Sequence, residues 1–212
     1  MLKLFWPVRV EDGAFLNSGN LFGARPEVYA QFDLLGHNGL DMVAARGTKI
    51  YASHDGWIIE QTSKETGYGL RITQRVEADG KYYMLIYGHM ERLEKPEDIT
   101  WNWNSKSYPV KAGQVIGYVD STGFSTGDHL HFGLFEMDSN GNRLNYNNGY
   151  FGAINPAPLM AGELEKPYMN QFKTQNYKGE LRIVLQASNW AEWESLCRIY
   201  GVDPNKQDEQ IV

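Results

Sequence analysis

Two histidines separated by a single residue, His129 and His131, lie near the middle of the chain, directly after a glycine-rich turn. Alternate residues of a β-strand point to the same face, so these side chains would lie about 6–7 Å apart and could share one site. His37 and His89 lie in short glycine-containing motifs earlier in the chain. This concentration of histidine indicates a site that binds a metal or transfers protons.

A possible set of metal ligands begins with His37 and Asp41, which are four residues apart around a glycine that lets the chain turn. Histidine and aspartate are zinc ligands, and a catalytic zinc site has three protein ligands and one open position. One histidine of the His129/His131 pair would complete the set. The other, together with His89, would then be free for proton transfer and for hydrogen bonding to developing negative charge.

Strand-like patterns dominate the part of the sequence that contains these motifs. We expect 48–53 and 57–62 to pair as a hairpin at Asp55-Gly56, and a second hairpin to turn at Asp79-Gly80. Residues 91–107 should form a polar loop that carries tryptophans. The predicted strands are 48–53, 57–62, 68–76, 81–87, 108–110, 115–119 and 130–137. The predicted fold is mostly β: a small antiparallel sheet with surrounding loops, an irregular lead-in over 1–30, and a short C-terminal α/β appendage.

Composition narrows the possible classes of protein. The chain has 212 residues, a net charge of −6 and a pI near 5.4, and no basic tract, which argues against nucleic-acid binding. Its single cysteine, Cys197, excludes an intrachain disulfide and a multi-thiolate zinc site. The apolar first residues are soon interrupted by Pro7 and by charged residues, so we expect neither a signal peptide nor a membrane span there.

The sequence changes character after about residue 138. Asn155-Pro156-Ala157-Pro158 reads as a linker, 181–186 as a strand, and a helix should begin near Ser188 or Asn189. Either its own domain or a partner chain must cover the apolar stripe of this helix. The stripe consists of Trp190, Trp193, Leu196, Cys197 and Tyr200.

Motifs over about residues 20–137 together resemble the LytM/lysostaphin-type zinc endopeptidases of the M23 family. They are Gly36-His37-Asn38-Gly39-Leu40-Asp41, Gly47-Thr48, Tyr51-Ala52, Gly56, Gly67-Tyr68-Gly69, Tyr87-Gly88-His89, Gly113-Gln114-Val115-Ile116-Gly117 and Ser121-Thr122-Gly123-Phe124-Ser125-Thr126-Gly127-Asp128-His129-Leu130-His131-Phe132.

The resemblance implies one Zn²⁺ per chain, held by His37, Asp41 and His131, with His89 and His129 as the catalytic pair. It implies hydrolysis of peptide bonds in the stem or cross-bridge peptides of peptidoglycan. Together with the change of character after about residue 138, the resemblance leads us to expect a peptidase domain at 1–150, with its core at about 20–137, and a C-terminal extension at 151–212 that is a candidate for attachment or packing.

Several residues have an open role at this stage. Asp128 stands where the family usually has proline, and either ends a turn or hydrogen-bonds a nearby histidine. Tyr29 lies near the position of an active-site tyrosine in the family. Trp101 and Trp103 form a substrate platform or a hydrophobic cap, and His54 should be solvent-exposed at a turn.

Two other functions are compatible with parts of this pattern. A cupin-type metal enzyme would use Glu136, but Glu136 and His131 should face opposite sides of a regular strand. An inactive M23-like binding, activating or structural tail module is the other alternative. We expect action at the bacterial cell wall and, without an export signal, delivery in a phage virion or release with a holin. Residues 158–212 are then a candidate surface for a virion or homo-oligomer partner.

Overall fold

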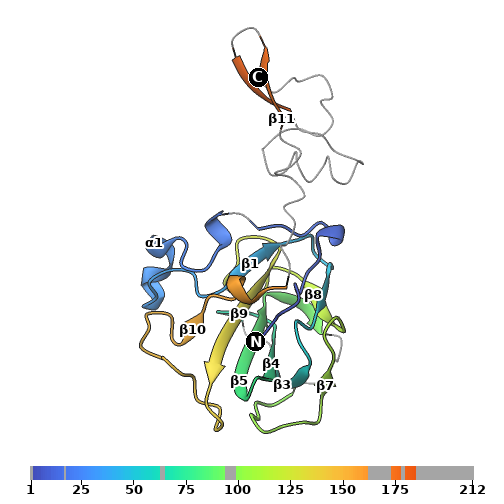
Figure 1. Cartoon of the computed structure of the whole chain (residues 1–212), viewed down its shortest axis with the longest axis vertical. Helices are drawn as coiled ribbons and strands as arrows, with labels where there is room; N and C mark the ends of the chain where they lie inside the picture. Colours follow the sequence, from blue (N-terminus) through green and yellow to red (C-terminus); the bar gives the residue numbers. More distant parts are fainter. Residues whose placement is uncertain are drawn as a thin grey trace. The chain divides into compact units, whose positions relative to one another are not determined.

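The computed structural model describes residues 2–16, 18–62, 65–93 and 99–161, and the strands β11 (Lys173–Tyr177) and β12 (Glu180–Val184). The chain separates into two compact units, Met1–Leu164 and Glu165–Val212 (Figure 1). In the second unit, β11 and β12 form an antiparallel pair, and β12 confirms the strand predicted at 181–186. The predicted helix near Ser188 lies outside the described residues.

A seven-stranded antiparallel sheet forms the centre of the first unit (Figure 1). Its strand order is β1-β9-β5-β4-β3-β7, and β10 pairs with β9 beyond the end of β1. The strands are β1 (Leu40–Val43), β3 (Gly56–Thr62), β4 (Arg71–Ala78), β5 (Lys81–Gly88), β7 (Pro109–Val110), β9 (His129–Met137) and β10 (Ala153–Ile154). The mostly-β antiparallel fold predicted from the sequence is therefore confirmed.

A second, three-stranded sheet has the order β2-β8-β6, formed by β2 (Lys49–Tyr51), β8 (Val115–Val119) and β6 (Met90–Leu93). The hairpin predicted between 48–53 and 57–62 is wrong, because β2 pairs with β8 whereas β3 pairs with β4 and β7. Asp55 does not close a turn: its carboxylate accepts hydrogen bonds from Lys111 Nζ (2.7 Å) and the Ala112 amide (2.9 Å).

The hairpin of β4 and β5 is confirmed at Asp79-Gly80. Ala78 and Lys81 are the last paired residues, and Asp79 and Gly80 between them have φ values of 53° and 73°. Two consecutive positive φ values suit the right-handed twist of a two-residue hairpin, and Asp-Gly tolerates them. This hairpin fixes the register of β5, whose far end leads into His89.

The core of the first unit follows the alternation of its strands. On β5, Leu85 and Tyr87 are buried in the larger apolar cluster, whereas Met84 and Ile86 are buried in a smaller cluster. The lead-in contributes Leu2, Leu4, Val8 and Ala14 to the larger cluster. Its short helices are η1 (Val10–Asp12), η2 (Ser18–Asn20), α1 (Pro26–Tyr29) and η3 (Ala30–Phe32).

The segment predicted as a linker is part of the first unit. The second half of Asn155–Pro158 is part of η4 (Ala157–Leu159), and the Leu4 amide donates to the Leu159 carbonyl at 2.8 Å. The Ala161 amide then donates to the Leu4 carbonyl at 2.7 Å. These backbone bonds tie the segment to the N-terminal residues, so it does not behave as a free linker. Among the described helices, none is long and apolar enough to cross a membrane.

Candidate metal centre and histidine pair

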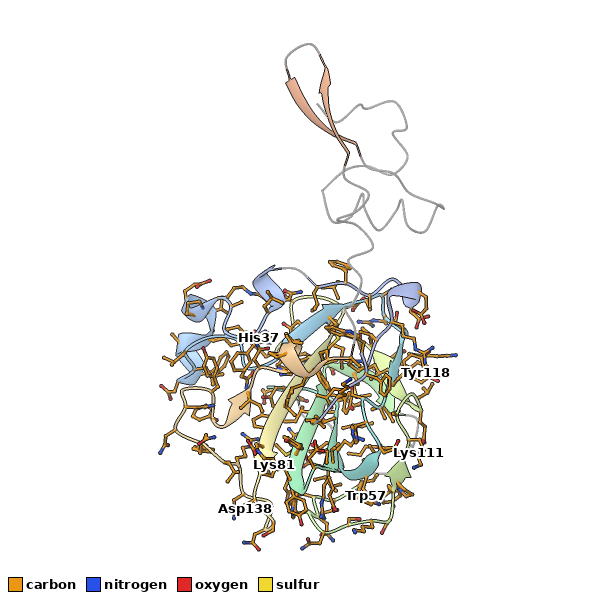
Figure 2. All side chains as sticks on the ribbon, in the orientation of Figure 1. His37, Trp57, Lys81, Lys111, Tyr118 and Asp138 are labelled. Atoms are coloured by element: carbon orange, nitrogen blue, oxygen red, sulfur yellow. The ribbon has the colours of Figure 1, made fainter. Side chains whose placement is uncertain are left out.

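Asp41 and His131 are cross-strand partners on β1 and β9, and His37 lies in the loop just before β1. All three side chains are buried, with residue exposures of 6%, 3% and 0%. Figure 2 shows His37 near the α1 side of the unit, away from Lys81 and Asp138. The sheet register therefore sets two of these side chains opposite each other, and the loop adds the third.

The ligand-type atoms of these residues form a nearly equilateral triangle. His37 Nε2 and His131 Nδ1 each lie 3.0 Å from Asp41 Oδ1, and they lie 3.1 Å from each other. Atoms this close can all reach one ion at the roughly 2.0–2.2 Å typical of zinc bound by nitrogen and carboxylate oxygen. His37 Nδ1 donates to the Leu21 carbonyl at 3.3 Å, which leaves the lone pair of Nε2 directed at the cluster.

The electrostatics of the cluster also suit metal binding. Burial would raise the pKa of Asp41, but its close contacts with the His131 and His37 rings outweigh this effect and hold the pKa below its usual range. Burial lowers the pKa of His131, with partial compensation from Asp41. The site therefore offers an ionised carboxylate and a neutral imidazole near pH 7, which are the forms that bind zinc.

Gly39 is required by the close packing of this cluster. A Cβ at this position would lie 2.6 Å from His131 Cε1 and 2.7 Å from the Phe132 carbonyl oxygen. Both distances are shorter than real Cβ contacts, so any side chain would displace the His131 ring or the β9 backbone. The glycine in the His37–Asp41 motif thus serves close approach, in addition to the turn that the sequence predicts.

His89 and His129 lie beside the triangle and form a pair, with ring centroids 4.7 Å apart. His89 Nδ1 lies 2.6 Å from the Thr122 carbonyl oxygen, and His129 Nδ1 lies 2.7 Å from the Gly127 carbonyl oxygen. A carbonyl only accepts, so each Nδ1 carries the proton and donates it. In the neutral rings, each Nε2 therefore keeps its lone pair.

The backbone and surroundings of His89 are unusual. Its φ of 61° lies in the left-handed region, and its amide donates to the Tyr68 carbonyl at 2.7 Å. Burial, with smaller contributions from His131 and His129, lowers the pKa of His89 to about 3. Left-handed residues other than glycine concentrate at functional sites. His89 is thus held neutral and in one orientation.

Two tyrosines border the histidines. The Tyr29 ring stacks on His37 at a centroid distance of 5.2 Å, and burial and the nearby Asp41 raise its pKa to about 12. Tyr68, which sequence reasoning did not single out as a site residue, packs against His131 at 4.9 Å and accepts a hydrogen bond from Asn38. The position of Tyr68 between Gly67 and Gly69 is the feature of the sequence that could have identified it as a site residue.

Other candidates from the sequence lie away from the triangle. His54 is partly exposed and contacts the Asp55 carbonyl, and Glu136 forms an ion pair with Lys81 at 2.7 Å, so no cupin arrangement forms. Trp103 is buried in the smaller apolar cluster, which makes it a cap, whereas Trp101 remains 43% exposed.

The role of Asp128 is now defined. Its carboxylate lies 3.6 Å from Arg46 Nη2, in a bend just before β9. No hydrogen bond from its side chain to a histidine occurs within the described residues. Of the two roles considered from the sequence, the structure therefore favours the one in which Asp128 ends a turn. Asp128 also forms an ion pair with Arg46.

The sequence from 35 to 146 matches the model of peptidase family M23. This match covers more than half of the 212 residues, and the chain belongs to that family. The His37, Asp41 and His131 set is a zinc site typical of the family, which confirms the predicted cofactor.

Curated relatives support the assignment. The chain is 38% identical over 172 residues to glycyl-glycine endopeptidase ALE-1 from Staphylococcus capitis, covering 78% of this chain and 41% of that protein. It is 33% identical over 135 residues to DD-carboxypeptidase/endopeptidase Mpg from Neisseria meningitidis, covering 58% and 28%. The chain thus spans less than half the length of these relatives.

A solved structure of the antimicrobial peptidase lysostaphin from Staphylococcus simulans is also similar. The sequence identity is 27%, the TM-score is 0.50, and the match covers 83% of this chain and 65% of lysostaphin.

Proposed function

We propose that this chain is a zinc-dependent endopeptidase that hydrolyses peptide bonds in the stem or cross-bridge peptides of peptidoglycan. The observation that carries the proposal is the buried triangle of His37 Nε2, Asp41 Oδ1 and His131 Nδ1 beside a second pair of histidines. Relatives named as a glycyl-glycine endopeptidase and a DD-carboxypeptidase/endopeptidase support the substrate class.

In this proposal, His37, Asp41 and His131 hold the zinc ion. When bound, zinc polarises a carbonyl oxygen and makes water acidic enough to act as a nucleophile near neutral pH. Three protein ligands would leave one coordination position of a bound zinc ion open for water or substrate, as in other catalytic zinc sites. The chain's contribution is a buried set of three ligand atoms that lie about 3 Å apart.

In this proposal, His89 and His129 transfer protons and stabilise the oxyanion. Each donates its Nδ1 proton to a backbone carbonyl, so each offers a lone pair at Nε2. One of them accepts the proton of the attacking water at Nε2 and returns it to the leaving amine. The other takes up a proton from solvent at Nε2 and then donates a hydrogen bond to the oxyanion that develops on the scissile carbonyl.

Digestion of purified cell walls tests this proposal. The zinc-loaded chain is incubated with peptidoglycan that has pentaglycine cross-bridges and with peptidoglycan that has direct stem-peptide cross-links. Mass spectrometry of the released fragments identifies the bond that is cut. Cleavage at a peptide bond in one or both substrates is expected, whereas intact peptides in both would contradict the proposal.

We also propose the phage setting expected from the sequence, in which a virion or holin-assisted lysis brings the enzyme to the wall. In that setting, residues 158–212 contact a virion or homo-oligomer partner. Two observations test this narrower proposal: the genes that flank the coding sequence, and the presence of the protein in purified particles. Tail or holin genes are expected, and a chromosomal setting without phage genes would contradict it.

A further inference from the structure

The loop between β8 and β9 provides the backbone carbonyls that accept hydrogen bonds from both His89 and His129. Thr122 supplies the carbonyl that accepts from His89 Nδ1, and Gly127 supplies the carbonyl that accepts from His129 Nδ1. The Ser125 hydroxyl also lies 3.3 Å from His129 Nδ1. The conformation of this one loop therefore decides which nitrogen of each ring carries the proton.

The two halves of the loop are anchored differently. The Thr122 hydroxyl donates to the Met90 carbonyl at 2.9 Å and accepts from the Leu70 amide at 3.1 Å, which fixes the half that contacts His89. Within the described residues, 125–127 hydrogen-bond only inside the loop and to His129. The half that contacts His129 therefore depends on how the ends of the loop are held.

Arg46 lies where the two ends of the loop meet. Its Nη2 contacts Oδ1 of Asp120, the first residue of the loop, and lies 3.6 Å from Oδ1 of Asp128, the last residue of the loop. Asp120 is 7% exposed, and its carbonyl accepts the His129 amide at 3.1 Å. One guanidinium therefore joins both ends of the loop immediately beside His129.

The backbone that carries Arg46 is itself fixed. The Gly47 amide donates to the Val119 carbonyl at 2.9 Å, and the Val119 amide donates to the Thr48 carbonyl at 2.8 Å. This reciprocal pair of bonds attaches the turn after β1 to the end of β8. The backbone next to Arg46 is thereby fixed, and its side chain, which is 60% exposed, extends from there to the two aspartates.

We propose that Arg46 is a positioning residue: its ion pairs with Asp120 and Asp128 close the loop and keep the Gly127 carbonyl on His129 Nδ1. The catalytic consequence rests on the proposed role of His129 in proton transfer. The proposal also gives a reason for an aspartate at position 128, where the family resemblance predicts proline. In this chain an ion pair replaces the rigidity that a proline ring would provide.

The test compares Arg46→Ala and Arg46→Lys with the unmodified, zinc-loaded full chain. Lys81→Ala is the matched control, because Lys81 is 58% exposed, forms one ion pair with Glu136 and lies at the opposite end of the sheet (Figure 2). Nitrogen-15 NMR of the histidine rings reports which nitrogen of His129 is protonated. Release of dye from labelled peptidoglycan reports activity, and metal analysis and thermal melting report zinc content and stability.

In Arg46→Ala, the Nδ1 and Nε2 shifts of His129 should move towards each other as the two tautomers mix. Dye release should fall about tenfold, because one exposed ion pair contributes up to about fivefold and two act together. Zinc content and melting temperature should remain, Arg46→Lys should restore most of both signals, and Lys81→Ala should change neither.

An unchanged His129 tautomer in Arg46→Ala would overturn the proposal, whatever the activity. So would a loss of activity that follows a fall in melting temperature and that lysine does not restore. If the unmodified chain releases no dye, the proposed function fails, but the NMR comparison still decides whether Arg46 positions His129.

Discussion

Asp41 and His131 face each other across β1 and β9, with Asp41 Oδ1 3.0 Å from His131 Nδ1. Because the sheet register fixes this pair, the site needs only the loop residue His37 to complete a set of ligands. The fold therefore brings the three ligand residues of the metal site together. This arrangement leads directly to the first prediction.

The unmodified chain should bind about one zinc ion, and His131→Ala should lose most of it, because a nitrogen ligand is removed from a three-ligand site. Elemental analysis of the dialysed proteins measures the ratio. His54→Ala is the control, because His54 lies outside the cluster and this variant should keep its zinc. Undiminished zinc in His131→Ala would show that the ligand assignment is wrong.

Replacing His89 or His129 by alanine should separate catalysis from metal binding. Both variants should stay folded and keep zinc, yet peptidoglycan hydrolysis should fall by about 10²–10⁴-fold, as is typical when a general acid or base is lost. Turnover on labelled peptidoglycan, measured beside zinc content, provides the comparison. Near-normal turnover in both single variants would refute their catalytic role.

Gly39→Ala should damage the site by crowding it, because the new Cβ would lie 2.6 Å from the His131 ring. Overpacking of this kind costs about 1–3 kcal/mol, and weaker zinc binding should accompany the loss of stability. Thermal melting and zinc titration measure both effects. A Cβ at Gly127 meets nothing within 4 Å, so Gly127→Ala is the stability control. Equal melting temperatures for the two variants would contradict the prediction.

Two truncations should distinguish the end of the first unit from the predicted linker. A chain that ends after residue 164 should stay folded and bind zinc, since the first unit ends at Leu164. A chain that ends after Pro158 loses the hydrogen bonds of Leu4 with Leu159 and Ala161. At about 0.5–1.5 kcal/mol for each bond, the shorter chain should unfold at lower denaturant concentration.

Equal midpoints for the two truncations would show that residues 159–161 do not support the unit. Failure of the 1–164 chain to melt cooperatively would instead make the C-terminal unit an integral part of the enzyme. The tryptophan-rich stripe predicted near Trp190 would then be expected to stabilise the peptidase, and a role in binding a partner would lose its motivation.

The parts of the fold that could be predicted from the sequence depend on local rules. The alternation of side chains along a strand predicted that His129 and His131 of β9 face the same side of the sheet. Asp79-Gly80 predicted a hairpin because the positive φ values of such a turn favour these residue types. Asp55-Gly56 carries the same signal, but there the aspartate side chain bonds to Lys111 and Ala112. A turn dipeptide therefore predicts a change of direction without specifying which strands pair.

The sequence predicted the side chains of the candidate site but did not predict the residues that act through their backbone. Side-chain type and spacing, together with the family resemblance, brought out the five histidine and aspartate positions. Thr122 and Gly127, however, act through their backbone carbonyls, which residue type does not reveal. The partner of Asp128 is Arg46, which is distant in sequence and lies close to it because the turn between β1 and β2 is hydrogen-bonded to the end of β8.

Counting the chemical ends produced on purified peptidoglycan tests the central claim most directly. The zinc-loaded chain should release new α-amino groups without new reducing sugar ends, a chelator should abolish the release, and added zinc should restore it. This result is predicted because the proposed site cleaves peptide bonds and holds its metal through His37, Asp41 and His131. New reducing ends, or amino-group release that continues after the metal is removed, would contradict the account.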